Sequence, residues 1–293
     1  MEINELNLSQ IGLNVTIEPS TKALLSCGKK LREAFSQVGF VYIREHGINP
    51  DLIQRAMDAS KQYFLMPSEA KEAFPRDPTI QQGYVSPGRE IFDQKEDGTK
   101  ATHEEREAFE VTRITGEDAR FPDSEVPQLR PSLTQLAVDT KKLAYRILKA
   151  LALSMELHED YFVNCHQYIL GPKSVSKLRS IYYPPITKAI EEKMALEKSQ
   201  IVRCGEHSDY GTITFLYQDD MAGLEVRAVD NSWIQATPRS GTILINVGDL
   251  LEIYSNGLFP ATLHRVVIPG LLLIKILVCK LKYYGCTNPN LQN

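Results

Sequence analysis

The stretch Cys204-Gly-Glu-His-Ser-Asp-Tyr-Gly-Thr-Ile-Thr-Phe-Leu-Tyr217 joins a His-x-Asp pair, His207 and Asp209, to a run of β-forming residues. Alternate side chains of a β-strand share one face, so this spacing predicts that the imidazole and the carboxylate lie on one side of a strand. A second imidazole, His264, follows much later in the chain. It can reach the pair only on a distant strand, an arrangement that a β-barrel or jelly roll permits.

The residues around this pair read as a succession of short strands. After Lys177, β-rich runs cover 178–183, 212–217, 224–229, 233–236, 242–247 and 263–267, separated by turn residues. Strands that follow strands favour a barrel or jelly roll over a βαβ sheet. We therefore expect a mainly β protein with flanking helices, built on a double-stranded β-helix (jelly roll) core.

The N-terminal part has an α/β pattern. We expect a helix ending at Gly39, a strand over 40–43, a helix over 52–64, and a short helix from Pro67. Residues 75–130, rich in Pro, Gly and charge, predict an irregular segment, and the apolar spacing after Pro131 predicts a long helix to about His158. The predicted units are 1–130 and 131–293, with a charged insertion at 186–200 expected to form a helix or mobile loop near the site entrance.

Two imidazoles and one carboxylate are the ligand set of a non-haem Fe(II) centre that keeps positions open for O₂ and an organic ligand. The metal reading therefore assigns His207, Asp209 and His264 as catalytic metal ligands; the alternative is an exposed polar pair on a strand and a surface basic pair. His158-Glu-Asp160 is an internal control, because side chains two apart on a helix diverge by about 200°. Cys204 is expected to be a small buried residue, since a soft thiolate does not suit Fe(II).

Composition limits the class of partner. The 293 residues carry a net charge of −4 and are 43% hydrophobic and 24% charged, which is typical of a globular protein and argues against nucleic acid or an anionic membrane as the partner. The five cysteines form no CxxC pair and the polar start lacks a secretory pattern, so we expect a cytoplasmic protein. A small molecule and O₂ are the expected partners.

Several motifs resemble the isopenicillin N synthase-like branch of the 2-oxoglutarate and Fe(II)-dependent dioxygenases. They are Gly39-Phe-Val-Tyr-Ile-Arg-Glu-His-Gly47, Ile181-Tyr-Tyr-Pro-Pro185, Gly205-Glu-His-Ser-Asp-Tyr-Gly-Thr-Ile-Thr214, Ile245-Asn-Val-Gly-Asp249, Ser255-Asn-Gly257 and Leu263-His-Arg-Val266. The resemblance implies that His207, Asp209 and His264 bind iron, that Tyr183 touches the cosubstrate, and that 2-oxoglutarate and O₂ are consumed to give succinate and CO₂.

The chain departs from that family after Pro269. Relatives carry an Arg-x-Ser motif that holds the distal carboxylate of 2-oxoglutarate, whereas Ile274 and Ile276 stand here at the corresponding positions and no arginine follows Arg265. We therefore hypothesise that 270–293 is an alternative or truncated C-terminus that replaces the last strand or strands, weakens cosubstrate binding and leaves an exposed apolar edge. The run 270–281 is too short and too interrupted by lysine to span a membrane.

Other polar residues of the family-like motifs and of the strands are predicted to have supporting or structural roles. Asn246 and Asp249 are candidates either for supporting the metal ligands or for forming a turn, and the turn is favoured. Arg179 is either an anchor for an anion near the site or a solvated charge at a strand edge, and the solvated charge is favoured. His46 is expected to be structural in a His-Gly turn. His103 and His166 receive no role.

Three functions remain open from the sequence. The first is an Fe(II) and 2-oxoglutarate-dependent dioxygenase that hydroxylates, desaturates or cyclises a small organic substrate. The second is an oxidase resembling isopenicillin N synthase, which does not consume 2-oxoglutarate. The third is a catalytically impaired metal-binding isoform.

Overall fold

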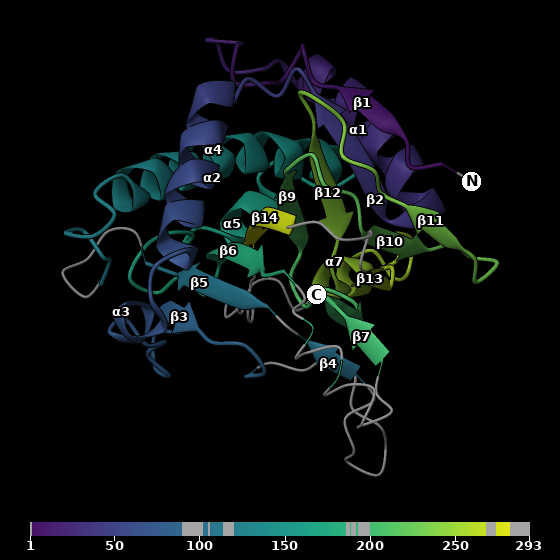
Figure 1. The fold of residues 1–293 in the computed structure, drawn as a ribbon. Coiled ribbons are helices and arrows are strands. Elements are labelled where there is room, and N and C mark those ends of the chain that lie inside the picture. The colour runs from purple at the N-terminus through teal and green to yellow at the C-terminus, as the bar shows by residue number, and fades with distance from the viewer. Residues whose placement is uncertain are drawn as a thin grey trace.

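A computed structural model describes residues 2–89, 102–104, 106–113, 120–185, 188, 192, 200–267 and 274–281. Its centre is an eight-stranded sheet with the order β1-β2-β12-β9-β14-β6-β5-β3. The strands are β1 (Glu5–Asn7), β2 (Phe40–Arg44), β3 (Gly83–Val85), β5 (Glu107–Val111), β6 (Lys177–Tyr183), β9 (Ile213–Gln218), β12 (Ile243–Val247) and β14 (Ile274–Leu281). A four-stranded sheet, β11-β10-β13-β8, lies against part of it (Figure 1).

The smaller sheet comprises β8 (Cys204–His207), β10 (Leu224–Arg227), β11 (Trp233–Gln235) and β13 (His264–Val266). A separate parallel pair joins β4 (Thr102–Glu104) to β7 (Gln200–Val202). Two sheets packed face to face, with chain-distant strands as neighbours, form the jelly-roll core that the strand succession predicted.

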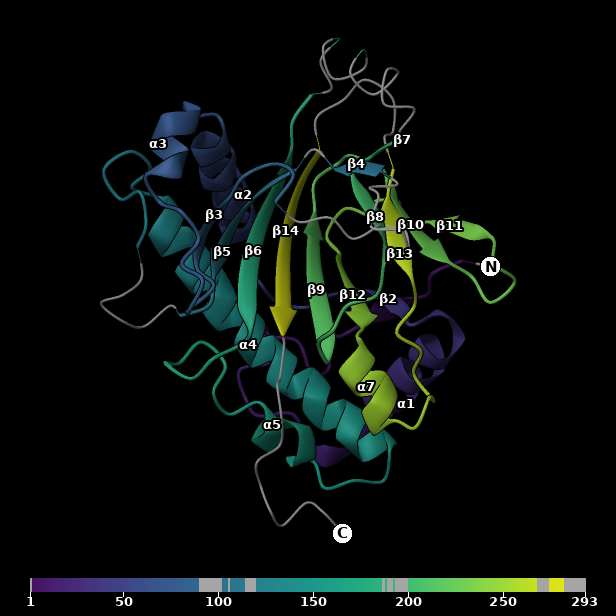
Figure 2. The same ribbon diagram turned by 90° about the horizontal axis from the view of Figure 1, so that it is seen from below.

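The described helices are α1 (Thr21–Val38), α2 (Pro50–Phe64), α3 (Ser68–Glu72), α4 (Leu129–Ser154), α5 (Tyr161–Cys165) and α7 (Asp249–Tyr254). The long helices α1, α2 and α4 pack on the outer face of the large sheet. Figure 2 shows α4 running across the face of β6, β14 and β9. The predicted helix ends are largely confirmed: α1 stops at Gly39, whose φ of 70° closes the helix, although α4 ends at Ser154, short of His158.

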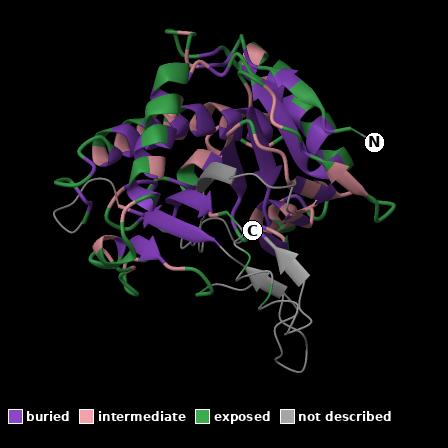
Figure 3. Ribbon diagram, in the orientation of Figure 1, coloured by how far each residue is buried: buried purple, intermediate pink, exposed green. Residues whose placement is uncertain are grey.

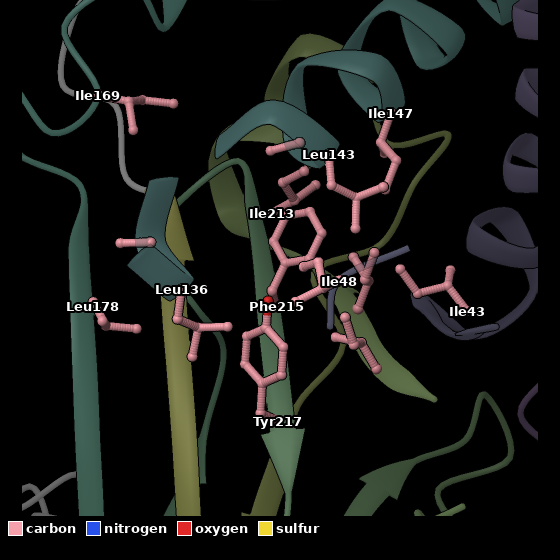
Figure 4. Close-up of a cluster of buried hydrophobic side chains, with 14 of the residues drawn as sticks. Ile43, Ile48, Leu136, Leu143, Ile147, Ile169, Leu178, Ile213, Phe215 and Tyr217 are labelled. Carbon is pink, nitrogen blue, oxygen red and sulfur yellow. The ribbon is translucent and has the colours of Figure 1, made fainter. Parts of the chain in front are cut away.

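Alternate side chains of strand β9 face two different parts of the protein interior. Its residues Ile213, Phe215 and Tyr217 enter the core beneath α4, where Figure 4 shows them facing Leu136 and Leu143. The alternate residue Leu216 belongs instead to the apolar cluster between the two sheets. Thr214, which shares that face, brings a hydroxyl to the inter-sheet side, where the predicted metal ligands also lie.

The expectation of an irregular segment over 75–130 is wrong for part of its length. Strands β3 and β5 add to the large sheet there, and β5 pairs with β6 from Glu107 opposite Tyr182 to Val111 opposite Leu178. Both β5 and β6 are buried along their whole length (Figure 3). The insertion at 186–200 lies almost entirely outside the described residues.

The hypothesis of an exposed apolar edge is also wrong for residues 274–281. Strand β14 is hydrogen-bonded on both sides, to β6 with Ile274 opposite Tyr183 and to β9 with Ile276 opposite Gln218. Residues 274–281 therefore form an interior strand of the large sheet. Residues 268–273 and 282–293 lie outside the described part.

Both predicted units contribute to the same sheet. Strand β2, from the first unit, pairs with β12 of the second, and α1 packs against α4 through one continuous core. Among the helices that the structure describes, none is long and apolar enough to cross a bilayer.

Candidate metal centre

The two histidines meet across the smaller sheet. His207 is the last residue of β8 and His264 the first of β13, and the two are register partners with ring centroids 4.3 Å apart. Asp209 joins them, so that one ligand atom from each of the three residues lies within 4.8 Å of the others. The structure thus brings together the three predicted metal ligands, and His158 is not among them.

The prediction that His207 and Asp209 share a strand is wrong in detail. Strand β8 ends at His207, and the register shifts between His264 opposite His207 and Val266 opposite Cys204. Asp209 is instead fixed from the start of α7, where the Asp249 amide donates to its backbone oxygen at 2.7 Å. Gly248 permits this close approach, because a Cβ there would lie 2.6 Å from the Asp209 carbonyl oxygen.

Backbone carbonyls set the tautomer of both histidines. His207 Nδ1 lies 2.9 Å from the Gly205 oxygen and His264 Nδ1 lies 3.1 Å from the Thr262 oxygen. A carbonyl oxygen only accepts, so each Nδ1 carries the proton and donates it. In the neutral imidazole, Nε2 is then the nitrogen with the lone pair, and this is the form that binds a metal.

The carboxylate of Asp209 is oriented in the same way. Its Oδ2 accepts hydrogen bonds from Thr214 Oγ1 at 2.6 Å and from Asn246 Nδ2 at 3.0 Å. These bonds fix the orientation of the carboxylate, which faces the two imidazoles. Two neutral imidazoles and one buried carboxylate, each held by a second hydrogen bond, fit a divalent iron ion.

The expectation that Asn246 serves a turn is therefore wrong, because it lies within β12 and its amide is directed at Asp209. Asp249 is not in a turn either, because it is the first residue of helix α7. Sequence reasoning missed Thr214 altogether. The signal available was its position as a polar residue in a strand whose neighbours are apolar.

The three groups open into a pocket between the sheets. The lining comes from both sheets and comprises Phe40, Arg106, Arg179, Ile181, Tyr183, Cys204, Thr214, Leu216, Leu224, Asn246 and Val266, besides the three predicted ligands. Most of this lining is apolar, as in sites for small organic molecules. Two arginines add positive charge to it.

Arg179 is not the solvated edge charge that was expected. It is 6% exposed, lies in an interior strand, and has its Nε 3.5 Å from Glu110 Oε1. Arg76 and Lys177 contact the same carboxylate at 2.8 and 3.1 Å. Desolvation by burial lowers the pKa of Lys177, and the neighbouring charges of Arg76 and Arg179 lower it further.

The predictions for His46 and Cys204 fit the structure, and His166, which received no role, is buried with two hydrogen-bond partners. His46 is buried and its Nδ1 accepts from the Ile48 amide at 3.1 Å, which matches a structural role in the turn at Gly47. His166 joins Phe162 O to Thr212 Oγ1, and burial lowers its pKa. Cys204 is 2% exposed and packs within the inter-sheet cluster, as expected of a small buried residue.

Comparison with family models identifies two matches. Residues 8–132 match the N-terminal domain described as "non-haem dioxygenase in morphine synthesis", and residues 174–270 match the 2OG-Fe(II) oxygenase superfamily. The second match contains all three groups of the candidate centre.

Individual relatives agree with these matches. The chain is 32% identical over 257 residues to a homoarginine-6-hydroxylase of Glycine max, covering 83% of this chain and 73% of the relative. It is 28% identical to a 2-oxoglutarate-dependent dioxygenase of Aspergillus rugulosus, covering 82% and 73%.

Solved structures share the fold as well. A full-length Neurospora crassa protein in complex with alpha-KG and thymine has a TM-score of 0.80 and 26% identity, covering 96% of this chain and 86% of that one. With the fold, the geometry of the centre and the sequence matches in agreement, the chain belongs to the isopenicillin N synthase-like branch of the 2-oxoglutarate and Fe(II)-dependent dioxygenases.

Proposed function

We propose that His207 Nε2, Asp209 Oδ1 and His264 Nε2 hold one Fe(II) ion, and that the pocket between the sheets takes 2-oxoglutarate and a small organic substrate. Bound iron supplies O₂ activation coupled to decarboxylation of 2-oxoglutarate, the chemistry of this family. The observation that carries the ligand assignment is the pair of Nδ1 contacts to backbone carbonyls, which leaves both Nε2 atoms ready to bind a cation.

In this proposal, different residues of the pocket orient the metal ligands and contact the cosubstrate. Thr214 and Asn246 orient the Asp209 carboxylate, and Tyr183, 2% exposed and lining the pocket, contacts the cosubstrate. The apolar lining excludes water around the reacting substrate. Among hydroxylation, desaturation and ring closure we place hydroxylation first, supported by relatives that are named hydroxylases.

The proposal also covers the cellular location of the protein and the two units predicted from its sequence. We place the protein in the cytoplasm, supported by the free, buried state of Cys27, Cys165 and Cys204. The units 1–130 and 131–293 stay a prediction about the organisation of the sequence.

The test is an anaerobic Fe(II) titration of the purified chain and of three single variants. His207→Ala and Asp209→Ala should each abolish tight binding, because each removes one of three ligands. His158→Ala is the matched control, since His158 belongs to the other His-x-Asp sequence and is exposed at the protein surface, and it should bind iron like the wild type. Unchanged iron affinity in both ligand variants would show the assignment to be wrong, and succinate formation by the wild type tests the use of 2-oxoglutarate.

A further inference from the structure

The imidazole of His264 is a candidate metal ligand whose ring orientation the fold must fix. A torsion that ends on a planar ring has broad minima, so the bonds of the side chain alone do not hold the ring in one position. A hydrogen bond from its Nδ1 to the Thr262 oxygen, at 3.1 Å, restrains the rotation. A ring that turned further would carry Nε2 away from His207 and Asp209, so side chains that pack against the ring also affect metal binding.

Phe40 packs against this imidazole. Its ring centroid lies 5.4 Å from that of His264, and the two ring planes are nearly perpendicular, at 76°. This is the favourable edge-to-face arrangement of two aromatic rings. Phe40 is 1% exposed and lines the pocket between the sheets. The Phe40 ring therefore limits the rotation of the imidazole from a side that the hydrogen bond to Thr262 does not cover.

The same residue also adjoins the support of Asp209. In the pairing of β2 with β12, Phe40 lies directly opposite Asn246. Opposite residues of an antiparallel pair place their side chains next to each other on one face of the sheet, and both of these line the pocket. The Asn246 amide donates to Asp209 Oδ2. Phe40 thus flanks two of the three candidate ligands, His264 directly and Asp209 through Asn246.

The backbone before Phe40 is fixed against the chain that carries His264. Phe40 is the first residue of β2 and follows Gly39, which ends α1. The Gly39 oxygen accepts from the Val247 amide at 2.9 Å. A Cβ on Gly39 would lie 2.3 Å from the Pro260 oxygen, so the junction of α1 and β2 lies directly against the segment before His264. The position of the Phe40 ring is therefore set relative to both β12 and that segment.

We propose that Phe40 is a positioning residue of the metal centre, which holds the His264 imidazole in the orientation that binds iron. This inference rests on the proposed function. Phe40 belongs to the first predicted unit, whereas all three candidate ligands belong to the second. The junction of α1 and β2 thereby contributes to iron binding without supplying a ligand. Its apolar ring also keeps water from one side of the imidazole, as the hydrophobic surroundings of metal sites do.

The test is an anaerobic titration of the full chain with Fe(II), and a second titration with Co(II), whose visible absorption reports the number and arrangement of its ligands. Phe40→Leu keeps an apolar side chain and removes the flat ring. We expect its Fe(II) affinity to fall roughly three- to tenfold, the usual contribution of an edge-to-face pair, and its Co(II) spectrum to change in position or intensity. Phe40→Met, whose unbranched chain adapts to gaps, is a second variant with the same expected result.

Phe35→Leu is the matched control. Phe35 lies in α1, is 0% exposed, and forms an edge-to-face pair with Phe259, with 6.2 Å between ring centroids and 68° between the rings. Both residues belong to the core on the helical side of the large sheet. The substitution should lower the free energy of unfolding about as much as Phe40→Leu does, yet leave the Fe(II) affinity and the Co(II) spectrum as in the wild type. Urea denaturation of each variant checks the first point.

The result that would overturn the inference is a wild-type Fe(II) affinity and Co(II) spectrum in both Phe40 variants. An equal change in Phe35→Leu would overturn it as well, because the effect would then come from general loosening of the junction. Neither result affects the proposed function as long as the wild type binds iron and His207→Ala does not. A wild type without iron affinity, or a His207→Ala variant that binds iron equally well, would overturn both.

Discussion

The hydroxyl of Thr214 makes the shorter of the two described hydrogen bonds to the carboxylate that we assign to the metal. Its Oγ1 lies 2.6 Å from Asp209 Oδ2, and the residue is 3% exposed. Thr214→Val keeps the shape and removes the donor, so Asp209 loses part of its orientation. We expect Fe(II) affinity to fall by roughly 10- to 100-fold, the usual effect of losing an outer-shell partner, in an anaerobic titration.

Thr140→Val supplies the control for this experiment. Thr140 is also fully buried, and its Oγ1 bonds Tyr217 and the Leu136 carbonyl on the helical side of the sheet. Its replacement should lower the free energy of unfolding by about 1–2 kcal/mol and leave iron affinity unchanged. Equal iron affinity in Thr214→Val and wild type would show that the Thr214 hydroxyl is not needed to orient the carboxylate.

The three candidate metal ligands were predictable as a cluster from the sequence, whereas the residues that support them were not. A His-x-Asp pair and a later His carry a recognisable chemistry, and short-range spacing limits where they can lie. The contact of Asn246 with Asp209 depends on β12 pairing with β9, where Asn246 lies opposite Thr214. Such neighbours are set by sheet register, which a single sequence specifies only through its apolar pattern.

The junction between α1 and β2 depends on one glycine. Gly39 has a φ of 70°, and a Cβ there would lie 2.3 Å from the Pro260 oxygen and 2.8 Å from Thr262 Oγ1. Gly241 has the same φ with nothing within 4 Å of its Cβ position. The two sites therefore separate the cost of the backbone conformation from the cost of the collision.

We expect Gly241→Ala to lower the free energy of unfolding by about 1–2 kcal/mol, the cost of the left-handed conformation for a residue with a Cβ. Gly39→Ala should lower it by at least about 3 kcal/mol, because the chain before His264 must also move. Urea denaturation measures both. An equal loss of unfolding free energy in both variants would mean that residues 260–262 move away from the new Cβ at no energetic cost.

Strand β5 shows why some elements escaped sequence reasoning. Its sequence Glu-Ala-Phe-Glu-Val carries two acids, which argues against a buried strand. The structure compensates both charges: Glu107 pairs with Lys71, and Glu110 contacts Arg76 and Lys177. These cations come from remote segments, so the compensation is not visible in the local pattern.

At the scale of the molecule, the two predicted units share their secondary structure. Strand β2 lies between β1 and β12, and β5 lies between β3 and β6, so the first unit supplies strands to both ends of the large sheet. The core beneath α4 contains residues of α1, α2, β2 and β9 alike. Neither unit buries its apolar surface without the other, which implies cooperative folding.

This predicts that a single transition describes unfolding in urea. Trp233, the only tryptophan, lies in β11 beside the guanidinium of Arg265 and reports on the smaller sheet, while far-UV circular dichroism reports on the helices. The two signals should give the same midpoint and the same slope, because β12 cannot keep its partner β2 while α1 unfolds. A fragment of residues 131–293 should accordingly fail to fold and to bind Fe(II), although it contains all three ligands. Separate transitions, or a folded fragment that takes up iron, would instead make residue 130 a boundary between independent domains, and the iron centre would then need only the second of them.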